Sequence, residues 1–162
     1  MGEIMKALIV YDSVYGNTQK IAKAIGNAIS CETKVLRAGE AEFSALGKFD
    51  ILIAGSPTHA GRPTRAMKEF LEKIPANALE NTSAASFDTR ASMQGQGAFV
   101  RGIINFFGYA SPNIAKTLQK KGANLIAAPE GFTVKGKEGP LENGELERAA
   151  EWAGKLCKKQ KL

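Results

Sequence analysis

The sequence predicts an α/β fold with one doubly wound parallel sheet, and three observations support this prediction. Apolar runs that suit buried strands alternate along the chain with amphipathic stretches that suit helices. The run over residues 50–56 is apolar between its end residues, as in a strand covered on both faces. The first run, residues 4–11, ends in a polar turn at residues 12–18 that opens directly into a helical pattern. We expect a single domain over residues 1–162.

Five segments are predicted as strands because they are short, apolar and rich in β-forming residues. They cover residues 4–11, 33–37, 50–56, 83–88 and 124–128. Residues 131–144 form a Gly-rich stretch that is long for a loop. Within it, apolar and polar residues alternate at 132–134, so these residues are candidates to extend the last strand.

Helices are predicted between the strands from apolar positions that recur at helical spacing. In residues 19–29, Ile21, Ile25 and Ile29 recur every four residues. Residues 38–48 carry a weaker pattern of one or two turns. Three further helices are expected: one from near Thr64 to Pro75, one from Pro112 to Gly122, and a final one with an apolar face of Leu146, Ala149, Ala150, Ala153, Leu156 and Cys157.

Composition excludes several classes of protein. No apolar stretch reaches the length of a membrane span, and the N-terminal apolar run is too short for a secretion signal, so we expect a cytoplasmic protein. Cys31 and Cys157 are far apart in the sequence and are expected to be reduced thiols that form neither a disulfide nor a metal site. His59 is the only histidine, which argues against zinc or iron.

The formal net charge of +6 comes largely from lysines near the C-terminus and in the helix predicted after Pro112. These lysines form either a solvated basic face or a surface for an acidic protein partner. Nucleic acid is not an expected partner, because basic and aromatic residues are not interleaved in a recognisable module.

The polar turn after the first strand predicts a phosphate site. The first N–H groups of a helix lack partners within the helix and carry partial positive charge, so an anion binds there favourably. The turn has neither the lysine of a nucleotide-triphosphate loop nor the three glycines of a dinucleotide fingerprint. Ser13, Thr18 and backbone amides would therefore bind the phosphate, with no cation in the loop. The alternative is an ordinary helix cap by Ser13, Asn17 or Thr18.

The run Ser13-Val14-Tyr15-Gly16-Asn17-Thr18 resembles the S-x-[TY]-G-[NH]-T loop of the flavodoxin family. The resemblance implies a five-stranded sheet of order 2-1-3-4-5 in a flavodoxin-like three-layer sandwich, with FMN as the cofactor. It also implies an FMN-binding electron-transfer flavoprotein with a redox partner protein. In such a carrier the flavin supplies the redox chemistry, and no catalytic side chain is required.

Two further loops resemble the family's flavin-ring segments. Residues 56–61 resemble the S-P-T-x-x-G segment that lines one ring face, and residues 89–97 resemble the loop that covers the other. The cofactor-binding residues that the resemblance implies are Ser13, Val14, Tyr15, Gly16, Asn17, Thr18, Pro57, Thr58, His59, Ala60, Gly61, Thr89, Arg90, Ala91, Gly95 and Gly97.

Several side-chain roles stay open at this point. His59 either stacks on or edges the flavin, or is a polar loop residue in water. Arg90 either lies near the pyrimidine carbonyls or pairs with a carboxylate. Asp88 is expected to end a strand or cap a turn. Tyr11 is expected to contribute packing, and Tyr15 its backbone N–H.

The aromatic segment Phe99–Tyr109 is unusual for the family. It is either a helical turn packed on the sheet, or an apolar lid or homo-oligomer contact beside the flavin. The second possibility favours an alternative function, an NAD(P)H-dependent quinone or FMN reductase on the same fold. A third possibility is a flavin-free interaction or receiver module, although Asp50 begins its strand instead of ending it.

Overall fold

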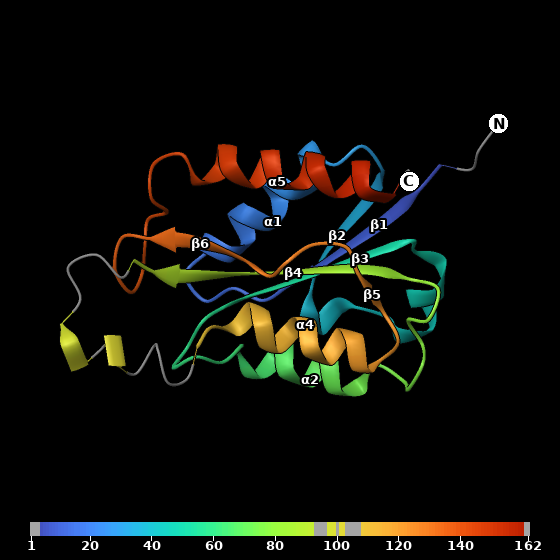
Figure 1. Cartoon of the computed structure of the whole chain (residues 1–162), viewed down its shortest axis with the longest axis horizontal. Helices are drawn as coiled ribbons and strands as arrows, with labels where there is room; N and C mark the ends of the chain where they lie inside the picture. The colour runs from blue at the N-terminus through green and yellow to red at the C-terminus, as the bar shows by residue number, and fades with distance from the viewer. Residues whose placement is uncertain (1–3, 93–96, 100, 103–107, 161–162) are drawn as a thin grey trace.

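The computed structural model describes residues 4–92, 97–99, 101–102 and 108–160 and contains a twisted parallel sheet between two layers of helices (Figure 1). The strands are β1 Lys6–Tyr11, β2 Glu32–Arg37, β3 Ile51–Pro57, β4 Ser83–Ala91, β5 Asn124–Leu125 and β6 Glu130–Val134. Their order is β2-β1-β3-β4-β5, with β6 also paired to β4, and every pairing is parallel. The predicted fold class and strand order are therefore confirmed.

The last strand is interrupted, which the sequence only partly predicted. β5 pairs with Ser83 and Ala84, and β6 pairs with residues 87–91 further along the same edge of β4. The expected strand over residues 124–128 is therefore too long, and residues 130–134 are the true continuation. Pro129 lies in the gap and has no N–H to donate to a strand ladder, which accounts for the break.

Strand β4 is longer than predicted. Because β6 pairs with residues 87–91, the ladder continues past Asp88, which is buried inside the strand and does not end it. Thr89, Arg90 and Ala91, which were expected in a loop, are strand residues.

The helices cover both faces of the sheet. α1 and α5 lie on one face, and α2 and α4 lie on the other (Figure 1). Their bounds are α1 Asn17–Ala28, α2 Arg65–Lys73, α4 Ala110–Lys120 and α5 Glu145–Gln160. Residues 38–48 form two short 3₁₀ helices, η1 Ala38–Glu40 and η2 Phe43–Lys48. α4 begins two residues before Pro112, since proline is tolerated in the first turn of a helix.

Each face of the sheet has its own apolar core. On the α1/α5 face, the rings of Phe87, Phe132 and Trp152 meet edge to face at centroid distances of 6.1–6.3 Å.

Leu146, expected on the buried face of the last helix, is 43% exposed, and Trp152 contributes to that face instead. Leu146 lies in the first turn of α5, at the helix end.

The two cysteines lie together at the end of the sheet where the strands begin. Cys31 precedes β2 and Cys157 lies near the end of α5, and their Sγ atoms are 2.9 Å apart as thiols. Their wide separation in sequence gave no sign of this contact.

Within the described residues, no helix is both long enough and apolar enough to span a membrane.

Candidate functional site

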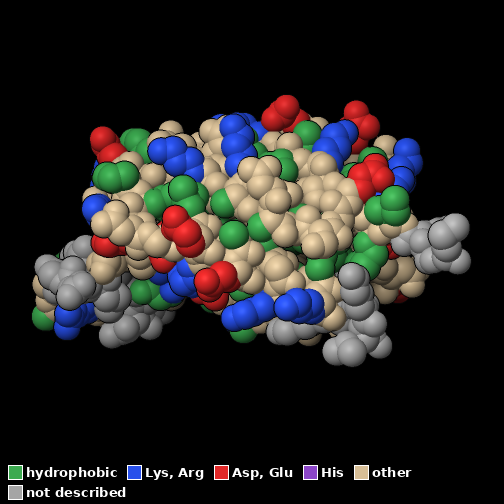
Figure 2. Space-filling view, turned by 90° about the horizontal axis from the view of Figure 1, so that it is seen from above, with side chains coloured by type: hydrophobic (Ala, Val, Ile, Leu, Met, Phe, Trp, Pro, Cys, Tyr) green, Lys and Arg blue, Asp and Glu red, His purple; other side chains and the backbone are tan. Residues whose placement is uncertain are grey.

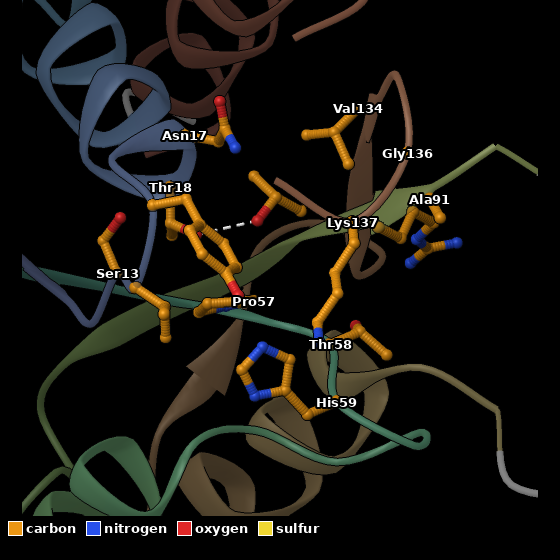
Figure 3. Close-up of a pocket in the computed structure, with 14 residues that line it drawn as sticks. Ser13, Asn17, Thr18, Pro57, Thr58, His59, Ala91, Val134, Gly136 and Lys137 are labelled. Atoms are coloured by element: carbon orange, nitrogen blue, oxygen red, sulfur yellow. Dashed lines mark hydrogen bonds between the residues drawn. The ribbon is translucent and has the colours of Figure 1, made fainter. Parts of the chain in front are cut away.

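A cavity of about 310 Å³ lies at the carboxyl ends of β1, β3, β4 and β6 (Figure 3). This is the edge of an open α/β sheet at which ligands bind. The lining residues come from four segments of the chain. They are Ser13, Val14, Tyr15, Asn17, Thr18, Pro57, Thr58, His59, Thr89, Arg90, Ala91, Val134, Gly136 and Lys137.

The first wall is the turn between β1 and α1. Gly16 adopts a left-handed conformation with φ of 93°, and its N–H donates to Ser13 Oγ at 3.0 Å. Among the described residues, no side chain caps the first turn of α1, and residues 17–20 include no acid. The side-chain cap considered from the sequence is therefore not formed, and the helix amides remain available to an anion.

Thr18 joins this wall to the sheet. Its Oγ1 is 2.7 Å from Thr89 Oγ1 on β4, and both residues are buried. Thr18 was expected to contact phosphate directly, but the structure shows its hydroxyl bonded to Thr89. One hydroxyl can donate and accept at once, so this bond leaves Thr18 able to make a second one.

Arg37 supports the turn from behind, which sequence reasoning missed. Its Nη1 donates to Ser13 O at 2.9 Å and pairs with Asp12 at 3.4 Å, and the guanidinium lies 5.2 Å from the Tyr11 ring centroid. Asp12 also accepts a hydrogen bond from Thr64 Oγ1. Tyr11 is buried and serves in packing, as expected.

The second wall follows β3. His59 and Arg62 exchange two backbone hydrogen bonds, and both residues between them have positive φ, 49° at Ala60 and 79° at Gly61. This is the geometry of a two-residue type I′ turn. His59 is exposed and lines the cavity, whereas Ala60 and Gly61 form the turn tip and do not.

The third wall is the end of β4, where Arg90 and Asp88 form an ion pair. The Arg90 guanidinium donates twice to the Asp88 carboxylate at 2.7 Å and lies 3.4 Å from the Tyr109 ring centroid. Asp88 also accepts from the N–H of Ser111 in the first turn of α4. The carboxylate-paired alternative for Arg90 is therefore the one observed, and Asp88 caps a helix.

The fourth wall, which sequence reasoning missed, is the loop after β6. Val134, Gly136 and Lys137 line the cavity, and the Lys137 side chain extends across it toward Thr58 and His59 (Figure 3). Asn17 Nδ2 donates to Glu138 O at 2.9 Å, which ties this loop to α1. The signal was present in the sequence, because this loop also leaves the carboxyl end of a strand.

Charged side chains on α5 hold β6, and with it the fourth wall, in place. Arg148 donates to Glu145 at 2.8 and 2.9 Å and to Glu130 at 2.9 Å, and Glu145 accepts from Thr133 N–H at 2.7 Å. Hydrogen bonding from Arg148, together with that from Thr133, lowers the pKa of Glu145 against the opposing effect of burial.

Some predicted residues do not reach the cavity. Gly95 lies outside the described residues, and so do residues 100 and 103–107 of the aromatic segment. Gly97 is described and exposed but is not among the lining residues. Phe99 is 82% exposed, so this residue at least is not packed on the sheet.

Known proteins resemble this chain both in sequence pattern and in fold. A family model described as flavodoxin matches residues 9–152. No curated protein matches the sequence.

Solved structures share the fold at low sequence identity. A flavodoxin from the domain Archaea superposes with a TM-score of 0.75 and 20% identity, covering 98% of this chain and 100% of that one. Oxidised flavodoxin 1 from Bacillus cereus superposes with a TM-score of 0.72 and 20% identity, covering 94% of this chain and 97% of that one. The rubredoxin oxygen:oxidoreductase of Desulfovibrio gigas superposes with a TM-score of 0.70 and 21% identity, covering 96% of this chain but 36% of that one.

Proposed function

This chain belongs to the flavodoxin family, whose members bind FMN, and on that premise we propose that its cavity holds FMN and that the protein carries electrons between partner proteins. The observation that carries the proposal is the uncapped N-terminus of α1, whose residues Asn17 and Thr18 line the cavity. An anionic ester is the group that such a helix end binds.

The phosphate end of FMN fits the first wall. A Cβ built on Gly16 would meet no atom within 4 Å, so the backbone there is open to close approach by a ligand. We infer that the amides of the turn and of the first helical turn bind the phosphate, with Ser13 and Thr18 beside it. Lys137, on the fourth wall, adds to the cavity a positive charge that no loop residue of the first wall supplies.

The flavin end fits the remaining walls. The cavity volume falls in the range of about 300–1,000 Å³ that is typical of sites for small molecules and cofactors. Pro57, Ala91 and Val134 present apolar surface, and Thr58 and His59 present polar groups. When bound, FMN accepts and donates the electrons, while the side chains of this protein bind and orient it.

We also propose that the partner docks at the cavity rim with an acidic surface. Lys137, Lys135 and Arg62 are exposed in the segments that border the cavity. On the α1/α5 face, Lys and Arg are interspersed with Asp and Glu (Figure 2). Positive charge at the rim would speed the encounter with an acidic protein and make it sensitive to salt.

Titration of the cofactor-free protein with flavins tests the binding step. FMN and riboflavin share the ring and differ in the phosphate, so we expect riboflavin to bind at least about tenfold more weakly, since charge-assisted hydrogen bonds contribute about 1.5–3 kcal/mol. Equal affinities for FMN and riboflavin would contradict phosphate capture by α1.

A second measurement tests the carrier role. The FMN-loaded protein is mixed with NADPH or NADH alone, and flavin absorbance is followed. An electron carrier keeps its absorbance until a reductase protein is added. Rapid bleaching by the nucleotide alone would favour the NAD(P)H-dependent reductase instead, and failure to gain colour with FMN would favour a flavin-free module.

A further inference from the structure

The thiol pair at the other end of the sheet is a second site, independent of the FMN cavity. Cys31 lies between α1 and β2, and Cys157 lies in the last turns of α5. Their Sγ atoms are 2.9 Å apart, although the residues are 126 positions apart in the chain. The cavity lies at the carboxyl ends of the strands, whereas Cys31 precedes β2 at the opposite end.

Packing holds both thiols in place. Cys157 is 4% exposed and belongs to the apolar core together with Ile29 and Leu156. Cys31 is half-buried against the same core, and its carbonyl accepts a hydrogen bond from Thr33 Oγ1 at 2.9 Å. The thiols therefore meet because α1 and α5 pack side by side. Cysteine side chains are short, so the packing of these elements alone brings the sulfur atoms together.

The two sulfur atoms lie close to disulfide-bonding distance. A disulfide has an S–S distance of about 2.05 Å, so the two sulfur atoms need to approach by less than about 1 Å. The difference in exposure also sets an order of reaction. Cys31 is the more accessible thiol, and Cys157 lies beneath it as the buried partner.

We propose that Cys31 and Cys157 form a reversible dithiol–disulfide site that exchanges with low-molecular-weight disulfides. The Cys31 thiolate, having lost its proton to water, attacks one sulfur of the small disulfide, forms a mixed disulfide and releases one small thiol. Cys157 then loses its proton, attacks the Cys31 sulfur and releases the second small thiol. The protein pair is oxidised by two electrons, and the small disulfide is reduced to two thiols.

The cross-link would fasten the end of α5 to the segment between α1 and β2. A disulfide that closes so long a loop restricts the unfolded chain strongly, so the oxidised protein is expected to unfold at a higher denaturant concentration. The FMN cavity lies at the other end of the strands, and its affinity is expected to stay the same.

The test uses the folded full chain and glutathione disulfide as the probe. Wild-type protein is expected to lose both reactive thiols and two hydrogen atoms of mass, without a retained glutathione, and to regain both thiols with dithiothreitol. Cys157→Ser removes the resolving thiol, so Cys31 is expected to retain one glutathione. Cys31→Ser leaves only the buried Cys157, which is expected to react much more slowly.

The comparison requires that both cysteine variants are folded, and circular dichroism and FMN affinity establish whether they are. The result for the wild-type protein does not depend on the variants. A wild-type protein that stays fully reduced, or that ends with a glutathione on each cysteine, would overturn the proposal. So would Cys157→Ser remaining unmodified, because Cys31 would then not be the entry point.

Discussion

The hydroxyl groups of Thr18 and Thr89 lie 2.7 Å apart and join the first turn of α1 to strand β4 beneath the cavity. The carbonyl of Thr89 also accepts a hydrogen bond from Thr58 N–H at 2.9 Å. One residue of β4 thus fixes the positions of the first and second walls relative to each other. Thr89 therefore connects the turn before α1 to the loop after β3, and the geometry of the cavity depends on these bonds.

Replacing Thr18 with valine should weaken both the fold and the site. The substitution keeps the shape but leaves the Thr89 hydroxyl without its buried partner, at a cost of about 1–3 kcal/mol in the free energy of unfolding. FMN affinity should fall as well, because the first turn of α1 loses its anchor. Denaturant unfolding and FMN titration measure the two effects.

Thr33→Val is the matched control for this variant. Thr33 is partly buried, its hydroxyl bonds to Cys31 O, and it lies at the far end of the sheet. Its substitution should leave FMN affinity unchanged. If Thr18→Val bound FMN as tightly as Thr33→Val does, Thr18 would have no part in positioning the site.

Reversing the charge of Lys137 should weaken FMN binding. Lys137 lines the cavity, so Lys137→Glu places a carboxylate in the site proposed for an anionic cofactor. A loss of about tenfold in affinity is expected, which corresponds to about 1.4 kcal/mol of lost electrostatic attraction. The loss should shrink as salt is added, because salt screens charges that are accessible to water.

Lys135→Glu makes the same change in net charge two residues earlier. Lys135 is exposed and is not among the lining residues, so its effect on affinity should be clearly smaller. Equal losses in the two variants would mean that only the overall charge of the protein matters. Both affinities are measured by fluorescence titration at two salt concentrations.

The fold could be predicted from the sequence because its signals are local. The apolar run at residues 51–55 and the spacing of Ile21 and Ile25 specify a buried strand and a helix face without reference to the rest of the chain. The polar turn at residues 12–18 and the helix after it could be found for the same reason, since turn and helix are contiguous, and phosphate binding there stays a prediction. Thr64, predicted near a helix start, caps α2 by accepting from Met67 N–H.

The contacts that were missed are those that only tertiary packing creates. A carboxylate partner for Arg90 was considered, but Asp88 was not identified as that partner, because β4 was expected to end at Asp88, whereas it continues between β3 and β6. Lys137 lines the cavity from the loop after β6, the strand that Arg148 of α5 contacts at Glu130. Both contacts depend on the position of β6, which the sequence predicted only in part.

Gly55 is required by the ring packed over it. A Cβ at this position of β3 would overlap the ring of Phe87, and that ring is fully buried against Phe132 and Trp152. Gly55→Ala should therefore lower the free energy of unfolding by about 1–3 kcal/mol, which is the typical cost of overpacking. Denaturant unfolding provides the measurement.

Gly154→Ala tests the same substitution where space exists. A Cβ on this residue of α5 would meet no atom within 4 Å, and alanine favours a helix over glycine by about 0.5–1 kcal/mol. This variant should be as stable as the wild type or more stable. Destabilisation of both variants to the same extent would rule out steric overlap with Phe87 as the cause at Gly55.

Acid should weaken the anchor between α5 and β6. Arg148, the main cause, lowers the pKa of Glu145 in the folded protein below its ordinary value of 4.5, whereas the unfolded chain keeps that ordinary value. As the pH falls from about 4.5 through the lowered pKa, the unfolded state takes up this proton first, so the stabilising contribution is lost in that window and is fully present above it. Glu145→Gln should lose about 1.5–3 kcal/mol of stability at neutral pH, since hydrogen bonds to charged groups contribute about that much. Its stability should also fall less steeply with acid. Glu147→Gln, on the same helical turn but exposed, is the control. Unfolding curves at pH 7 and across the acid range measure both effects, and a Glu145→Gln profile parallel to that of the wild type would mean that this carboxylate does not set the acid dependence.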